Sequence, residues 1–343
     1  MKKKKKFLGW FRKNLLSIIT IALSLGILAA FLSTKYGLEN FKDALLHFHF
    51  IWLFWIAAAI VAGWLLEAYV LYLFCRHLDG DWTFGQSFYV GMIGLFYSAL
   101  TPFNMGEPME IYKMSYMGMD TGAATSVIAL KSLVHHVVML FYSLFLISFE
   151  LQYFQTRVSN FSFITLFGLL TNGLFISFVL LIILKEQVAD GLLKGAAYLL
   201  GKIGFHKTSK KVYEFGQKQL RIFHKSSQLF GHSTPLYIVT VLLTLAQITI
   251  ASLISYFVYR CFGLKGRSVF TMVAADTFVT MVASFVPLPG SSGGAEGGFF
   301  LFFQDSFGNM IVPGITLWRL STYYINILFG GIIAWVGRKK YKV

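Results

Sequence analysis

The sequence predicts an all-α polytopic membrane protein with about six full spans and two re-entrant helical hairpins arranged as inverted repeats. Three observations support this prediction: the composition, the positions of the basic residues and two helix-breaking segments. The 343 residues are 56% hydrophobic and only 13% charged, whereas about a quarter of the residues of a soluble domain are charged. Several stretches of about twenty residues carry almost no charge, which is typical of helices that cross a bilayer.

The expected spans follow one another along the chain. Stretches long enough to cross a bilayer of about 30 Å at about 1.5 Å per residue lie at roughly 15–34, 51–75, 122–149, 161–184, 235–262 and 314–336. The first stretch follows basic residues, as a signal peptide does, but it lacks a cleavage pattern of small residues. We therefore expect it to be an uncleaved anchor.

Two further apolar stretches, 84–101 and 268–286, each run into a break that contains proline and glycine. Each break is followed by a second apolar piece, at about 108–118 and 295–304, which is too short to cross a bilayer. Each stretch either crosses the membrane fully, which gives eight spans, or enters and returns as a re-entrant hairpin.

Basic residues favour the second topology. Seven Lys or Arg lie in the first thirteen residues, nine lie between Lys185 and Lys225, and four lie after residue 337. Eight spans would place the nine-charge segment outside, against the positive-inside rule. With two re-entrant hairpins, this segment and both termini face the cytoplasm. The net charge of +15 thus reflects topology, and no soluble module indicates nucleic-acid binding.

An internal repeat also favours the hairpins. ALTPFNMGEPMEIY and FVPLPGSSGGAEGGFF share the order apolar run, proline, glycine, glutamate, apolar run. A cation follows each segment in the next span: Lys131 lies 24 residues after Glu107, and Arg319 lies 23 residues after Glu296. This pattern is typical of inverted repeats in membrane transporters.

We expect a single integral membrane domain over residues 1–343. Its first repeat covers about 51–184 and its second repeat about 235–336, with a basic loop at 185–234 between them. The loop is partly amphipathic. It either lies on the surface of the inner leaflet or is a solvated connector whose charges only fix the topology.

Helix breaks at membrane depth require a protein-lined interior, because free backbone groups have no partner in lipid. The residues expected to form the breaks are Pro102, Gly106, Pro287, Pro289, Gly290, Gly293 and Gly294. In one interpretation, free amides at the start of a returning half-helix meet a phosphate. In the other, these residues only shape a tight turn.

Ionisable residues inside the spans are candidates for function, because they are costly in hydrocarbon. The candidates for a headgroup or translocation path are Lys131, Arg319, Glu107, Glu296, Asp276 and His135. We expect the two cations to hold a phosphate. The glutamates at 107 and 296 would balance the cations and gate the path, or only cap helices and pair buried charge.

The remaining polar residues have weaker assignments. Asp276 belongs to the path or has a hydrogen-bonded structural role. His135 lies one helical turn after Lys131 and shares its face, whereas His136 points about 100° away, so the two form a poor metal site. Both also fit a packed, hydrogen-bonded role. Glu67 lies in the middle of a span and needs a partner that the sequence does not identify.

Enzyme motifs are weak. DGD at 79–81 has the form of the D-x-D motif of metal-dependent glycosyltransferases, but it lies in a loop of about eight residues without a nucleotide-binding domain. GSSGGAEGG matches neither a P-loop nor a dinucleotide motif. We expect a transporter with no catalytic residue, metal or cofactor, and leave transferase activity open.

The segment PLPGSSGGAEGGFF, with TPFNMGEPMEIYKMSYMG upstream and LWRLSTYYINILFGG downstream, resembles the transmembrane region of the lysylphosphatidylglycerol synthase/flippase family. The resemblance covers roughly residues 10–340. The family includes the flippase half of the multiple peptide resistance factor. The family's P-x-P-G-G-x-G-x-x-E core, earlier proline and glycine-glutamate segment and late arginine match Pro287, Pro289, Gly290, Gly293, Glu296, Pro102, Gly106, Glu107 and Arg319. Ser291 replaces the usual second glycine, and Lys131 lies where relatives often carry arginine.

This resemblance implies a flippase-like fold that moves a lipid between leaflets. Longer members of the family add a soluble aminoacyl-transferase domain, which these residues do not contain, so we do not expect synthesis of lysylphosphatidylglycerol here.

We therefore expect a flippase of the bacterial cytoplasmic membrane that moves a phospholipid, aminoacylated or not, or a lipid-linked glycan. The alternatives are a membrane-embedded transferase that acts on a lipid and a non-transporting partner of a cell-envelope synthesis enzyme. The expected partners are an anionic or aminoacylated phospholipid or a glycolipid, together with a lipid-modifying synthase or glycosyltransferase. No nucleic acid is expected. The lipid, the direction, the energy source and a homodimer are left open.

Overall fold

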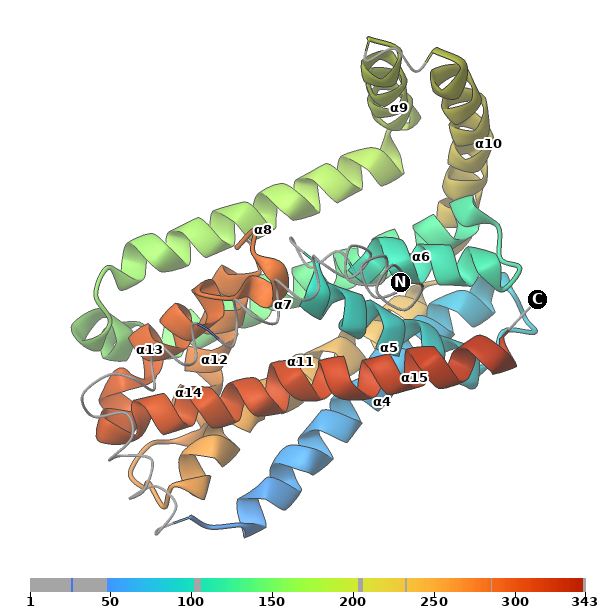
Figure 1. The fold of residues 1–343 in the computed structure, drawn as a ribbon. Helices are drawn as coiled ribbons and strands as arrows, with labels where there is room; N and C mark the ends of the chain where they lie inside the picture. Colours follow the sequence, from blue (N-terminus) through green and yellow to red (C-terminus); the bar gives the residue numbers. More distant parts are fainter. Residues whose placement is uncertain are drawn as a thin grey trace, which may run out of the picture.

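A computed structural model describes residue 26 and residues 48–101, 106–202, 206–231, 233–284 and 286–341. These residues form helices joined by short turns, and within them no strand is present (Figure 1). The predicted all-α class is therefore confirmed. Apart from residue 26, the predicted span at 15–34 lies outside the described residues, and so does the predicted break residue Pro102.

Within the described ranges, five helical segments are long and apolar enough to cross a membrane. They are α4 (Ile51–Leu78), α7 (Thr121–Arg157), α8 (Phe161–Leu184), α11 (Thr234–Cys261) and the segment Pro289–Arg338. The protein is therefore a multi-pass membrane protein, as the apolar composition predicted.

The last of these segments consists of several helical pieces. It contains α13 (Gly294–Phe307), α14 (Ile311–Arg319), a π-helical turn (Leu320–Tyr324) and most of α15 (Ile325–Lys340). The π-helical turn interrupts the span predicted at 314–336. Such turns are rare and occur frequently at functional sites.

Helices α4 and α11 form an antiparallel pair that defines two ends of the bundle. His77, near the end of α4, hydrogen-bonds Ser233 just before α11 (2.9 Å). At the other end, the amide of His49 donates to the carbonyl of Cys261 (2.8 Å). We refer to the end near His77 as end A and to the end near Cys261 as end B.

A first pair of shorter helices begins and finishes at end A. Helix α5 (Phe84–Leu100) follows α4 after a short turn and packs against α6 (Gly106–Tyr116), which leads into α7. Tyr89, early in α5, and Tyr116, at the end of α6, line one pocket. Both outer ends of this pair therefore lie at end A.

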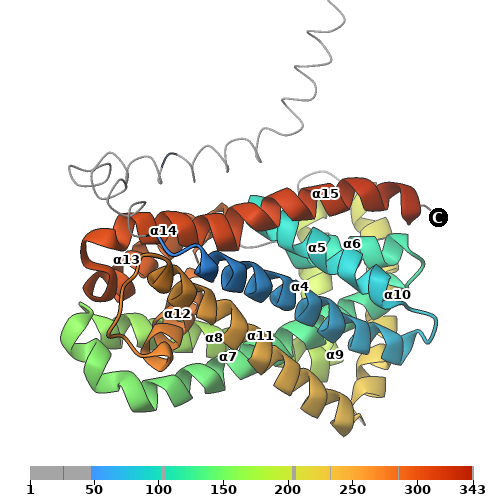
Figure 2. The ribbon, with the colours of Figure 1, turned by 90° about the horizontal axis from the view of Figure 1, so that it is seen from below.

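A second pair begins and finishes at end B. Helix α12 (Val269–Ala283) follows α11 and packs against α13 (Figure 2). Arg267, just before α12, forms an ion pair with Asp305 near the end of α13 (2.7 Å). The two helix pairs therefore enter the bundle from opposite ends.

The inner tips of the two pairs meet inside the bundle. The hydroxyl of Tyr323, in the π-helical turn, donates to the carbonyl of Ala99 near the end of α5 (3.0 Å). The turn Pro289–Ser291, which precedes α13, packs on α5. Gly290 has a φ of +58°, and a Cβ there would overlap the Tyr323 ring, so glycine is required at this contact.

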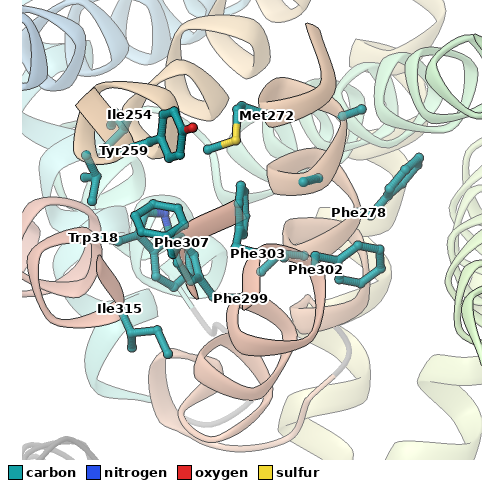
Figure 3. Packing of buried hydrophobic residues seen from close by; sticks show 14 of the residues in the cluster. Ile254, Tyr259, Met272, Phe278, Phe299, Phe302, Phe303, Phe307, Ile315 and Trp318 are labelled. Atoms are coloured by element: carbon teal, nitrogen blue, oxygen red, sulfur yellow. The ribbon is translucent and has the colours of Figure 1, made fainter. Parts of the chain in front are cut away.

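An aromatic core holds the second helix pair against its neighbours (Figure 3). The ring centroid of Phe299 lies 4.3 Å from that of Phe303 and 4.8 Å from that of Trp318 in α14. Phe278 of α12 packs against Phe302 with a centroid distance of 5.8 Å. Contacts of this kind fix the relative positions of α12, α13 and α14.

The segment predicted as a basic loop forms two helices, α9 (Glu186–Lys202) and α10 (His206–Phe230), which extend beyond the bundle (Figure 1). A hydrogen bond from Lys194 holds the pKa of Asp190 below its usual value. The amide of Gly122 in α7 donates to the Gln219 side chain of α10 (2.7 Å). Contact of this segment with a leaflet stays a prediction.

Candidate functional site

A cavity of about 600 Å³ lies among α4, α5, α6, α7, α8, α11 and the residue that follows α12. We refer to it as the central cavity. Its polar lining includes Glu67, Glu107, Glu110, Lys131, His135 and Gln247. A polar cavity within an apolar helix bundle is an unusual feature, because ionisable groups are costly in hydrocarbon.

Lys131 binds two carboxylates in this cavity. Its Nζ atom lies 2.6 Å from Oε1 of Glu67 and 2.8 Å from Oε2 of Glu110. The side chains of Lys131, Glu67 and Glu110 are 10%, 19% and 6% exposed. A buried ammonium needs such partners, because an unpaired charge in an apolar interior is very unfavourable. We refer to these three residues as the carboxylate–lysine cluster.

Each member of the carboxylate–lysine cluster comes from a different helix (α4, α6 or α7), and two glycines bring α6 close to the neighbouring α5. A Cβ on Gly94 of α5 would overlap the Glu110 carboxylate, and a Cβ on Gly106 would overlap the backbone at Gly94. Small residues of this kind let membrane helices approach closely. The close contact between α5 and α6 directs Glu110 towards Lys131.

The expected pairing of Glu107 with Lys131 is wrong. Glu107 is exposed and lines the central cavity, whereas Glu110, three residues later, is buried and binds Lys131. The two residues share a helix face, so one turn of α6 separates them. The repeat pattern indicated Glu107 because proline, glycine and glutamate occur in the same order in both segments. Only the direction of α6 decides which glutamate reaches α7.

His135 lines the central cavity together with Lys131, as their shared helix face predicted. His136 also lines it, and its Nδ1 lies 2.8 Å from Oδ1 of Asn172 on α8. Sequence reasoning did not identify Glu110, Asn172 or Gln247. Asn172 and Gln247 are polar residues within apolar spans, which is the pattern that could have indicated them, whereas Glu110 lies in the more polar α6.

Arg319 and Glu296 form a second buried pair, as expected. The Nε of Arg319 lies 2.8 Å from Oε1 of Glu296, and Nη2 lies 2.7 Å from Oε2. Both guanidinium Nη atoms also contact the Gly290 carbonyl at 3.3 Å. Glu296 in addition accepts from the Gly293 amide (2.7 Å) and so caps α13. The pair therefore links α14 to the turn and the first residues of α13.

The other predicted path and break residues lie elsewhere in the fold. Asp276 is buried in α12, where Ser255 of α11 donates to it, and it does not line the central cavity. Four of the predicted breaks lie in the extended and turn residues that lead into α13; they are Pro287, Pro289, Gly290 and Gly293. Gly294 is the first residue of α13. Gly106 begins α6.

Three features bear on enzymatic or redox chemistry: the DGD motif, groups of metal-binding residues and the two cysteines. The DGD motif at 79–81 forms a turn in which the Asp81 amide donates to the Asp79 carboxylate (3.1 Å). In the described part of the chain, no group of three His, Cys, Asp or Glu residues is arranged to hold a metal ion. Cys75 and Cys261 are free and buried.

Residues 17–330 match the family model described as the lysylphosphatidylglycerol synthase TM region. The chain belongs to this family. A UPF0104 membrane protein of Archaeoglobus fulgidus is 26% identical over 301 residues, which cover 82% of this chain and 85% of the relative. The family resemblance that the proline-glycine motif indicated is therefore confirmed.

In this member of the lysylphosphatidylglycerol synthase TM family, a smaller cavity of about 160 Å³ adjoins the central cavity. Glu67, Leu95 and Gln247 line both cavities. The hydrogen bond from Gln247 to Glu67 (2.9 Å) therefore lies between the two spaces. The smaller cavity also reaches Ser321 and Thr322 of the π-helical turn.

The charges of the central cavity restrict what it can bind. Among the described residues, it is lined by three carboxylates, at positions 67, 107 and 110, and by one ammonium, that of Lys131. Lys131 and Arg319 are both paired with carboxylates. A phosphate would therefore compete with a glutamate for either cation, whereas an ammonium group would meet excess carboxylate directly.

Proposed function

We propose that this protein moves the headgroup of a membrane lipid between leaflets through the central cavity, while the acyl chains stay in the bilayer. One observation carries the proposal: a cavity of about 600 Å³ with a carboxylate–lysine cluster lies inside an apolar bundle. A structural ion pair alone needs no cavity beside it. A polar passage is what a charged headgroup needs in order to cross about 30 Å of hydrocarbon.

In this proposal, the pairs α5–α6 and α12–α13 are re-entrant hairpins and form inverted repeats. Helix α6 has 11 residues and α13 has 14, which span only about 16–21 Å at about 1.5 Å per residue. Their entry from opposite ends of the bundle and the contact between their tips support this interpretation. The irregular backbone at residues 286–293, before α13, would then line a protein interior, where such backbone is tolerated in a membrane.

The proposed orientation places end A, with α9, α10 and the end of α15, on the cytoplasmic side of a bacterial cytoplasmic membrane. The basic residues of α10 and the arginine and lysines that close α15 support this orientation. The first hairpin then opens to the cytoplasm and the second to the outside.

The excess of carboxylate favours a headgroup that carries an amine, such as that of an aminoacylated phospholipid. The amine would bind at Glu107 and Glu110, and the headgroup would separate Gln247 from Glu67 as it moves between the two cavities. In this proposal the chain is a transporter rather than an enzyme. A headgroup recognised only through its phosphate would compete with Glu67 and Glu110 for Lys131, which is unfavourable in a buried site.

The test is reconstitution in liposomes that contain fluorescent lipid, with quenching of the outer-leaflet label. Aminoacylated phosphatidylglycerol, phosphatidylglycerol and a neutral glycolipid are compared. Wild-type protein should move the aminoacylated lipid fastest, and Glu110→Gln should slow it at least about tenfold, which corresponds to about 1.4 kcal/mol. Asp276→Asn is the matched control, because this buried carboxyl lies outside the cavity. Equal rates in wild-type, Glu110→Gln and protein-free liposomes would overturn the proposal.

A further inference from the structure

A second large cavity, of about 500 Å³, is lined by residues of α5, α6 and the C-terminal end of the chain. Helices α5, α6 and α15 can be followed in Figure 1. We refer to it as the tyrosine pocket. It is lined by four tyrosines, one tryptophan and two cations: Tyr89, Tyr112, Tyr116, Tyr341, Trp335, Lys113 and Arg338. It shares no lining residue with the central cavity.

Aromatic contacts hold the walls of the tyrosine pocket in place. Tyr89 is buried, and its ring centroid lies 4.9 Å from that of Tyr341. A Cβ on Gly337 would overlap the Tyr89 ring, so glycine lets α15 lie directly against it. The Tyr112 and Tyr116 rings stack with centroids 6.4 Å apart. The pocket is thus a built feature that three helices share.

The cations of the tyrosine pocket lack an acidic partner. The Nζ of Lys113 lies 5.6 Å and 5.3 Å from the ring centroids of Tyr112 and Tyr116. Within the described residues, neither Lys113 nor Arg338 forms an ion pair, and no carboxylate lines the pocket. Lys131 and Arg319, in contrast, each bind glutamate. Two uncompensated positive charges beside one cavity favour an anion.

The hydroxyl groups of the pocket are also available. For the four lining tyrosines, no hydrogen bond from the hydroxyl to another described residue is present. Tyrosine hydroxyls donate well to oxyanions. A guanidinium adds a planar set of donors suited to phosphate, and an ammonium adds a point charge.

The surroundings of the tyrosine pocket indicate the depth at which it opens. Trp335 is 69% exposed and Tyr112 is 56% exposed, and the apolar part of α15 ends just before Arg338. Exposed Trp and Tyr gather at the membrane–water interface, and Lys and Arg beside them reach the headgroup region. Basic pockets between membrane helices bind anionic headgroups at this depth.

We infer that the tyrosine pocket binds a phosphate group, with Arg338 and Lys113 neutralising its charge and the tyrosine hydroxyls donating to its oxygens. The phosphate comes either from an anionic lipid headgroup or from a soluble phosphate. This site is separate from the proposed translocation path, since the central cavity is acidic and is lined by other residues.

The test uses the purified 343-residue chain in detergent micelles. Binding of short-chain phosphatidylglycerol, short-chain phosphatidylcholine and inorganic phosphate is measured by native mass spectrometry and by the shift in melting temperature. Lys113→Gln combined with Arg338→Gln removes the cations, and Tyr116→Phe removes one hydroxyl but keeps its ring. Arg76→Gln is the matched control, because Arg76 also lies at end A beside a tyrosine ring, with 5.6 Å to the centroid of Tyr72, but outside the pocket.

Wild-type protein should bind phosphatidylglycerol more tightly than phosphatidylcholine. The double variant should lose at least about tenfold in affinity, Tyr116→Phe should lose a few-fold, and Arg76→Gln and Glu110→Gln should bind as wild type does. If inorganic phosphate binds and its affinity falls in the same variants, the ligand is a soluble phosphate. If only the lipid binds, the ligand is a lipid headgroup. Equal affinity in wild type and the double variant, or an equal loss in Arg76→Gln, overturns the inference.

Discussion

Glu110 and Lys131 lie 2.8 Å apart across the contact between α6 and α7, although 21 residues separate them in the chain. Glu67 of α4 binds the same ammonium at 2.6 Å. One buried cation thus links three helices through two carboxylates. Loss of the cation and loss of one carboxylate should therefore have different consequences.

Lys131→Met should destabilise the protein more than Glu110→Gln. The first change leaves two buried carboxylates without a cation, which costs about 3–5 kcal/mol. The second leaves Lys131 paired with Glu67 and costs about 1–3 kcal/mol through a weakened hydrogen bond. Thermal unfolding in detergent micelles measures both changes. A Lys131→Met variant that is as stable as Glu110→Gln would contradict the shared-cation geometry.

Arg319 and Glu296 should show strong energetic coupling. Each single change, Arg319→Gln or Glu296→Gln, leaves the other group charged and buried, at a cost of about 3–5 kcal/mol. The double variant should cost less than the two losses added together, with a coupling free energy of about 1–3 kcal/mol. Arg319→Lys should not restore stability, because lysine cannot form the two parallel hydrogen bonds. Additive losses in a double-mutant cycle would argue against this pair.

Gly290→Ala and Gly297→Ala should shift stability in opposite directions. Gly290 has a φ of +58° and faces the Tyr323 ring, so alanine there should cost about 1–3 kcal/mol. Gly297 lies within α13 with open space around it, so alanine should add up to about 1 kcal/mol of helix propensity. Melting temperatures of the two variants provide the comparison, and equal shifts would contradict the tight contact at Gly290.

The sequence predicts some parts of this arrangement and not others, for physical reasons. The pairing of Arg319 with Glu296 follows from the cost of burying either charge alone, and the pattern contained one candidate for each partner. For Lys131 the pattern contained several glutamates, and only the helix directions select Glu110 and Glu67.

The sequence does not predict the contacts between segments that lie far apart in the chain. The hydrogen bond from Tyr323 to Ala99 depends on how two distant segments pack together. The local composition of either segment does not predict this packing. The tyrosine pocket likewise collects residues from three helices. Hydropathy identifies apolar segments, but it does not show which side chains of separate helices share a cavity.

Cysteine labelling should distinguish re-entrant hairpins from full spans. Single cysteines at exposed turn positions flank the two helix pairs: Asp81→Cys and Asp120→Cys for α5–α6, and Lys265→Cys and Asn309→Cys for α12–α13. Both native cysteines, which are buried, are first replaced by alanine. A membrane-impermeant maleimide should label the first two from one side of the membrane and the last two from the other. Labelling of Asp81→Cys and Asp120→Cys from opposite sides would mean that α5 crosses the membrane fully. Two turns lie on opposite sides only if the chain between them crosses the membrane once.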